Sequence, residues 1–244
     1  MTPLIYHGTP LTPRAALNAV LPGRGACVSF WRPDDIEAVQ QVAPFIMLDN
    51  GAFSEWQAAL KRGEEFFVRA DWTPFYQWLE PRLFVPGRWA VIPDAPGAPS
   101  QLNDGLLNDW PFGQRGAPLW HMDAPIERLG RLCDRYDRVC LGWIGEFDPT
   151  IGAIKPEQRK VGCDAYLRRM EEVSAFLGNR WPFLHMMRGV AVARDYPFHQ
   201  RRQHVARAKR APARLARRPA QPLRSQRSMD RTASLCRQIG RKAA

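Results

Sequence analysis

The chain has 244 residues, of which 45% are hydrophobic, and a formal net charge of +11. This length suffices for one domain with a sizeable core, and the apolar content is ordinary for a globular protein. No apolar run approaches the roughly 18 residues of a membrane-spanning helix. The first residues also lack the basic segment and apolar run of a signal peptide, so we expect a cytoplasmic protein with no membrane partner.

The cysteines are scattered along the chain, at Cys27, Cys133, Cys140, Cys163 and Cys236. Their number is odd and none forms a Cys-x-x-Cys pair, so neither a disulfide framework nor a zinc site is expected. We therefore expect no bound metal, and we expect no other cofactor either.

Charge and aromatic content change sharply after Phe198. Residues 199–244 contain 14 Lys and Arg against one Asp, whereas residues 1–198 contain 21 Lys and Arg against 23 Asp and Glu. All 26 Phe, Trp and Tyr residues lie in the first part. A basic segment without aromatic residues cannot build a core. We predict a folded domain over residues 1–198 and a disordered, basic, low-complexity tail over residues 199–244.

Seven short apolar runs alternate along the first part with stretches of helical character. The predicted strands are residues 4–6, 26–30, 45–48, 89–92, 118–120, 138–141 and 182–184; the predicted helices are residues 73–79, 99–109, 124–136 and 163–177. This alternation predicts an α/β fold with a parallel sheet covered on both faces.

Seven strands are one fewer than a (β/α)8 barrel of the TIM type requires, and we favour that barrel, complete or without its last strand, over an open doubly wound sheet. Active residues of such barrels lie at the carboxyl ends of the strands. Polar residues occupy those positions here, namely His7, Asp49, Asp94, His121 and His185. We expect them to meet at one mouth.

The sharpest local motif is Asp49-Asn50-Gly51-Ala52-Phe53. Asn-Gly tolerates positive φ, so a turn here would hold the Asp49 carboxylate at the end of its strand. The structural alternative is an Asx-turn or a helix cap, for which Asp is also favoured.

Two further polar residues follow strands. Asp94 comes after Pro93, which ends the strand because its φ is fixed. His121 ends the run Pro-Leu-Trp. A plain turn aspartate and a buried, hydrogen-bonded histidine are the ordinary alternatives for these two residues.

A glycine loop follows the sixth strand, with Gly142 and Gly145 on either side of Trp143 and Ile144. Such a loop lets a flat ligand approach backbone N–H and C=O groups, although a tight turn would have the same composition. Two carboxylates beside such a loop suit a planar heterocycle, because a carboxylate accepts two adjacent N–H donors of a guanine-like edge.

The strings IMLDNGAF, VIPD, PLWH and CLGWIGEF, in this order and spacing, resemble the tRNA-guanine transglycosylase superfamily. The likeness spans roughly residues 4–198 and is greatest to the smaller phage- and plasmid-type members, which place 7-deazaguanine bases in DNA. The family fold is a (β/α)8 barrel. Its members exchange a base: an aspartate attacks C1′ of the nucleotide, guanine leaves and the queuosine-type 7-deazaguanine takes its place.

The resemblance implies roles for the residues that match its motifs. Asp49 would act in base recognition and proton transfer, with Asn50, Gly51 and Phe53 beside it. Asp94 would bind the guanine-like edge. His121 would face the base carbonyl, while Gly142, Trp143 and Gly145 would offer backbone contacts. The implied partners are DNA or tRNA and a 7-deazaguanine base; the oligomeric state stays open.

The sequence departs from the family in two respects. The Cys3His zinc site of the tRNA-acting members is absent, as in the smaller type. The nucleophilic aspartate is also missing: after Phe198 the family pattern leads us to expect a string such as Ser-Ala-Asp-Ser-Thr, whereas Gln200–His204 reads Gln-Arg-Arg-Gln-His.

A change of reading frame near codon 198 would explain the missing nucleophile. With permitted codons, Gln200–His204 read one nucleotide later encodes Ser-Ala-Asp-Ser-Thr. The alternative is a genuine basic arm that binds nucleic-acid phosphates. Two other functions stay open: a barrel hydrolase that uses Asp49 and Asp94 as an acid/base pair, and a nucleic-acid-binding protein that acts through its tail.

Overall fold

A computed structural model of the chain describes residues 4–64, 69, 71–145, 147–148, 153–154 and 159–198. The tail over residues 199–244, with its predicted disorder, expected nucleophile and hypothetical change of frame, lies outside these residues. The described part is an α/β structure with parallel sheets, as predicted.

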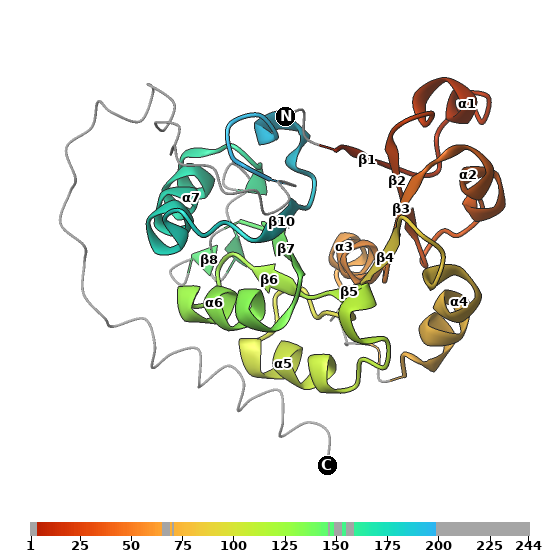
Figure 1. Cartoon of the computed structure of the whole chain (residues 1–244). Coiled ribbons are helices and arrows are strands. Elements are labelled where there is room, and N and C mark those ends of the chain that lie inside the picture. The colour runs from red at the N-terminus through yellow and green to blue at the C-terminus, as the bar shows by residue number, and fades with distance from the viewer. Residues whose placement is uncertain are drawn as a thin grey trace, which may run out of the picture.

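Five parallel strands form the first sheet in chain order (Figure 1). They are β1 (Tyr6–Gly8), β2 (Gly25–Ser29), β3 (Phe45–Asp49), β4 (Arg88–Val91) and β5 (Gly116–Ala117). The second sheet has the order β10-β7-β6 and is also parallel, with β6 (Leu119–His121), β7 (Arg138–Gly142) and β10 (Phe183–Met186). A short antiparallel pair, β8 (Phe147–Asp148) and β9 (Ala153–Ile154), was not predicted.

A single stretch of chain joins the two sheets. Only Pro118 separates β5 from β6, and it has no N–H for a ladder. Its carbonyl oxygen nevertheless accepts a hydrogen bond from the Cys140 N–H at 2.9 Å. Strands therefore form at all seven predicted runs, in the order of the chain. The predicted ends shift by up to two residues, so that His7 lies inside β1 instead of after it.

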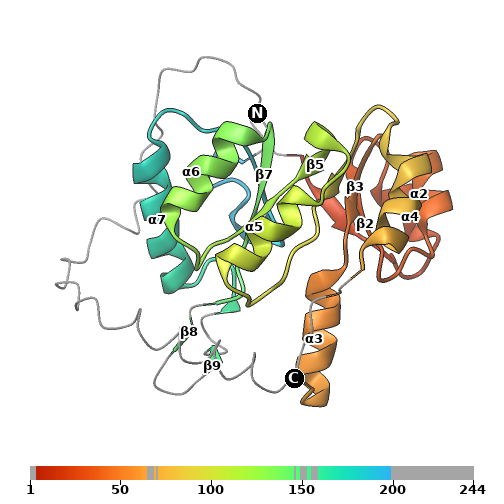
Figure 2. The same ribbon diagram turned by 90° about the horizontal axis from the view of Figure 1, so that it is seen from below.

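Among the described residues, seven α-helices connect the strands. They are α1 (Ala16–Val20), α2 (Ile36–Val42), α3 (Ala52–Arg62), α4 (Thr73–Leu83), α5 (Ser100–Asn108), α6 (Ile126–Arg135) and α7 (Asp164–Leu177), with short 3-10 turns at Gly113–Arg115 and Gly189–Val192. The four predicted helices correspond to α4–α7. Most of the helices lie around the outside of the strands, whereas α3 extends away from them (Figures 1 and 2).

Apolar side chains form two clusters on opposite faces of the strands. Met47 and Leu48 are consecutive in β3, yet Leu48 packs in the large cluster with the helices and Met47 in a small one. This division follows from the alternation of side chains along a strand. Trp89 of β4 and Cys140 of β7 join Met47, so residues of both sheets share the small cluster.

Strands β1 and β10 are the outer members of this arrangement, and no described strand pairs with both of them. Their side chains are nevertheless close, because the Tyr6 and His185 rings lie 5.4 Å apart. Within the described residues, no helix is long and apolar enough to cross a bilayer, and no three His, Cys, Asp or Glu residues are grouped to hold a metal ion.

Candidate functional site

A cavity of about 330 Å³ lies at the carboxyl ends of the strands. This volume is within the usual range for a small-molecule site. Eight of the predicted site residues line it: Asp49, Asn50, Phe53, Asp94, His121, Gly142, Trp143 and His185. They come from strands of both sheets and from the segments that follow them. The fold therefore brings together residues that lie far apart in the sequence.

Three predicted site residues do not line this cavity: His7, Gly51 and Gly145. The neighbours of His7, Tyr6 and Gly8, do line it, because alternate residues of a strand point to the same face. Burial and the nearby Arg24 lower the pKa of the His7 side chain. Gly51 and Gly145 instead adopt positive φ of 84° and 106° and shape the two turns.

The turn between β3 and α3 fixes the first carboxylate. The Gly51 N–H donates to Asp49 Oδ1 at 2.9 Å, and the Ala52 N–H donates to Asn50 Oδ1 at 2.8 Å. A Cβ on Gly51 would lie 2.9 Å from the Trp31 Cβ, so glycine is required by space as well as by φ. Asp49 thus forms the Asx-type contact of the structural alternative and also lines the cavity; the two interpretations are compatible.

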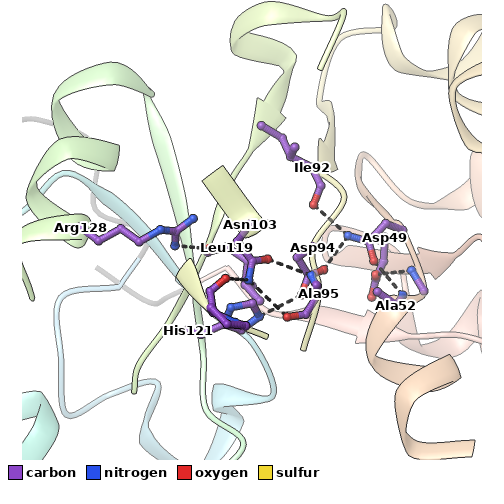
Figure 3. A network of polar contacts seen from close by, with 12 residues as sticks. Asp49, Ala52, Ile92, Asp94, Ala95, Asn103, Leu119, His121 and Arg128 are labelled. Atoms are coloured by element: carbon purple, nitrogen blue, oxygen red, sulfur yellow. Dashed lines mark hydrogen bonds and ion pairs between the residues drawn. The ribbon is translucent and has the colours of Figure 1, made fainter. Parts of the chain in front are cut away.

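The second carboxylate is held from two sides (Figure 3). Asn50 Nδ2 donates to Asp94 Oδ1 and to the Ile92 carbonyl oxygen, both at 2.8 Å, and His121 Nε2 lies 3.0 Å from Asp94 Oδ2. Asn50, Asp94 and His121 are 2%, 5% and 5% exposed. Because buried polar groups must be hydrogen-bonded, this network fixes the orientation of the Asp94 carboxylate. Each of its oxygens retains lone-pair capacity for a ligand.

Asn103 and Arg128 support this network, and sequence reasoning missed both. Asn103 Oδ1 of α5 accepts from the Ala95 N–H at 2.8 Å, which anchors the segment after Asp94. Arg128 Nη1 of α6 donates to the Leu119 carbonyl oxygen at 3.0 Å, in the strand that carries His121. Both side chains are buried. A poor helix former such as Asn inside a predicted helix was the available signal for the first.

The Asp49 carboxyl has a pKa near neutrality. Burial raises it from 3.8 to about 6, the negative charge of Asp94 adds to the effect, and the hydrogen bond from Gly51 opposes it. A group that titrates near the working pH can both donate and accept a proton. Asp49 is therefore suited to acid–base chemistry, and Asp94 to binding.

Arg188 closes one side of the cavity. Its guanidinium group lies 4.3 Å from the centre of the Phe53 ring and donates a hydrogen bond to the Trp143 carbonyl oxygen. Burial lowers the pKa of Arg188. Its φ of 58° is left-handed, the only such case among the non-glycine residues that the structure describes. Such backbone strain is common at functional sites. No motif in the sequence pointed to this residue.

The glycine loop offers fewer open backbone groups than predicted. The Gly142 carbonyl oxygen accepts from the Met122 N–H at 2.9 Å, and the Trp143 carbonyl oxygen accepts from Arg188. A carbonyl oxygen has two lone pairs, so the Gly142 oxygen retains acceptor capacity for a ligand.

Comparisons of this chain with models of protein families, with curated proteins and with solved structures found no match. The resemblance to the tRNA-guanine transglycosylases thus stays a prediction that rests on the residues quoted above.

Proposed function

We propose that the cavity binds a guanine-like base and that residues 1–198 form a base-exchange domain that acts on nucleic acid, similar to the tRNA-guanine transglycosylases. The observation that carries this proposal is the buried Asp94 carboxylate, oriented by Asn50 and His121 at the wall of the cavity. An oriented carboxylate accepts the two adjacent N–H donors of a guanine-like edge.

The other walls suit a flat ring. Phe53 and Trp143 contribute aromatic surface, and Met186 and Met187 contribute apolar, adaptable side chains. Asp49 would hold the departing or entering base by a hydrogen bond and transfer a proton to or from it. Its pKa of about 6 supports that role.

The parallel strands support a barrel for this domain. In the proposed arrangement the chain supplies seven strands of a (β/α)8 barrel, and the small cluster around Met47, Trp89 and Cys140 fills its interior. The eighth strand would lie between β10 and β1 and would carry the attacking aspartate. That segment of the chain follows Phe198, outside the described residues.

The covalent step needs a group that attacks C1′. Asp49 and Asp94 are the only carboxylates among the described residues that line the cavity, and the proposal uses them for the base. We therefore expect the 244-residue chain to bind a base but to be weak or inactive in base exchange. Robust incorporation of labelled guanine into DNA or tRNA by the purified chain would contradict this expectation.

Calorimetric titration of the full chain with 7-deazaguanine and with guanine tests base binding. Asp94→Ala should weaken binding by roughly ten- to a hundredfold, the range for losing hydrogen bonds to a charged group. Asp123→Ala, at a residue that lies after β6 and does not line the cavity, is the matched control. If the folded chain binds neither base, the proposal is wrong.

A second candidate is a nucleoside or glycoside hydrolase. It is favoured by one observation: two carboxyl groups, Asp49 and Asp94, line the same cavity, and burial raises the pKa of Asp49. Cleavage of a nucleoside without incorporation of another base would support it over base exchange.

A further inference from the structure

A second, smaller hollow of about 110 Å³ adjoins the cavity. Its lining residues are Phe53, Trp56, Gln57, Leu60, Lys61, Ile144, Arg159 and Arg188. Phe53, Ile144 and Arg188 also line the larger cavity. The two spaces therefore share one wall, which consists mainly of the Phe53 ring and the guanidinium group over it.

One face of α3 forms the other side of this hollow. Residues 53, 56, 57, 60 and 61 follow the i, i+3, i+4, i+7, i+8 spacing that places side chains on one side of a helix. Because α3 extends away from the strands (Figure 2), this face continues outward from the mouth of the cavity. The helix therefore provides a surface beside the base site, which the helices that lie around the outside of the strands do not.

The two spaces differ in their charged residues. The larger cavity is lined by Asp49 and Asp94, with Arg188 at the shared wall, whereas the smaller hollow is lined by Lys61, Arg159 and Arg188. No Asp or Glu occurs among the described residues that line the hollow. A ligand that fits both spaces has hydrogen-bond donors on a ring at one end and an anion at the other. A guanine nucleotide has this distribution.

Arg188 is placed to contact both ends of such a ligand. Its hydrogen bond to the Trp143 carbonyl oxygen and its position over Phe53 fix the planar guanidinium group, which has five N–H donors in all. The remaining donors can point to an anion in the hollow. A fixed guanidinium group loses little conformational entropy when it binds phosphate.

We infer that the smaller hollow binds the phosphate group attached to the nucleotide whose base occupies the larger cavity. Arg188 contacts the phosphate from the shared wall, and Lys61 and Arg159 contact it from the two sides of the hollow. The inference rests on the proposed function, which places the base in the larger cavity. It also gives the path of the nucleic-acid backbone away from the site, along the exposed face of α3.

The test compares nucleoside with nucleotide on the full chain. Calorimetric titration at low ionic strength with deoxyguanosine, its 5′-monophosphate and its 3′-monophosphate measures what the phosphate adds. We expect one monophosphate to bind about tenfold more tightly than the nucleoside, a gain typical of charge-assisted hydrogen bonds. The double variant Lys61→Ala, Arg159→Ala should remove most of that gain, because only Arg188 then contacts the phosphate, and it should leave deoxyguanosine affinity unchanged.

Two neighbouring cations provide matched controls. Arg62 follows Lys61 on α3 and Lys160 follows Arg159, and neither lines the hollow. The double variant Arg62→Ala, Lys160→Ala removes the same charge and should retain the phosphate gain. With a single-stranded oligonucleotide, the slope of log Kd against log salt should fall by about 0.7 per lost contact in the first pair. It should fall by less in the control pair, whose side chains do not face the bound phosphate.

The outcomes separate this inference from the proposed function. If deoxyguanosine binds but neither phosphate adds affinity, or if both double variants lose the gain equally, the hollow is not a phosphate site and the base site stands. If neither deoxyguanosine nor a free base binds the folded chain, the proposed function fails and the inference fails with it.

Discussion

The two neighbouring spaces of this site are built by different means. In the larger cavity Asn50, Asp94 and His121 are buried, and Asn50 and His121 hold the Asp94 carboxylate. In the smaller hollow, Lys61 and Arg159 are exposed on the rim. A buried polar group is costly when it loses its partner, whereas an exposed charge is screened by water. Substitutions in the larger cavity should therefore lower the stability of the fold. Substitutions of the cations in the smaller hollow should lower the affinity for a ligand without changing stability.

The largest effect is expected from Asn50→Ala. It removes the donor to Asp94 and to the Ile92 carbonyl oxygen and leaves buried groups unsatisfied, so the free energy of unfolding should fall by about 3 kcal/mol. Urea denaturation measures it. Asn108→Ala, at an exposed residue of α5, is the control and should change stability by less than about 0.5 kcal/mol. Equal effects of the two variants would contradict the role given to Asn50.

The turn that carries Asp49 should be nearly as sensitive. Gly51→Ala forces an alanine into positive φ and brings its Cβ to 2.9 Å from Trp31, so we expect a loss of about 2–3 kcal/mol. Gly63→Ala, at the end of α3, has a φ of 69° but no atom within 4 Å, and should cost about 1 kcal/mol. The difference between the two thermal denaturation curves isolates the steric part; no difference would show that Trp31 moves aside.

Asp49→Asn should reveal the raised pKa through pH. The folded chain binds a proton at Asp49 up to pH about 6, whereas the unfolded chain loses it near 3.8, so wild-type stability falls as pH rises through this window. Asn does not titrate. The variant should therefore gain stability relative to wild type between pH 4 and pH 7, as measured by urea denaturation at each pH. A constant difference across that range would show an ordinary pKa.

The smallest effect is expected at the shared wall. Arg188→Lys retains the charge but loses the planar group over Phe53, so stability should fall by only about 0.5–1 kcal/mol. A double-mutant cycle with Phe53→Leu tests whether this loss arises from the ring contact. A coupling energy of zero would show that the two side chains are merely neighbours.

The sequence predicted the strands more completely than the helices. The seven apolar runs form strands because a short, continuously apolar stretch that is buried on both faces has few other secondary structures open to it. Helices α1 and α2 were missed since they have only 5 and 7 residues, too few for a clear period. Helix α3 was missed although its apolar residues Phe53, Trp56 and Leu60 recur at helical spacing.

The same limits apply to the site. Asp49, Asp94 and His121 were predicted because polar residues at the ends of parallel strands converge at one edge. His7 was predicted to lie at the mouth, after its strand, but it lies within the strand and does not line the cavity. In a strand, a shift of one residue moves a side chain to the other face. Arg128 and Arg188 act through contacts with backbone groups of distant segments, which leave no pattern in the sequence. Asn103 contacts Ala95 nearby in the chain, and its place inside a predicted helix was the only signal for it.

The sequence by itself determined the alternation of strands and helices, the division of the chain at Phe198, and the carboxylates at the strand ends, because these depend on local composition and on the geometry common to parallel strands. Only the tertiary structure decided that Asn50 orients Asp94, that Arg188 lies over Phe53, and that a basic hollow adjoins an acidic cavity. Those features depend on distances between segments far apart in the chain, which packing fixes and local sequence does not.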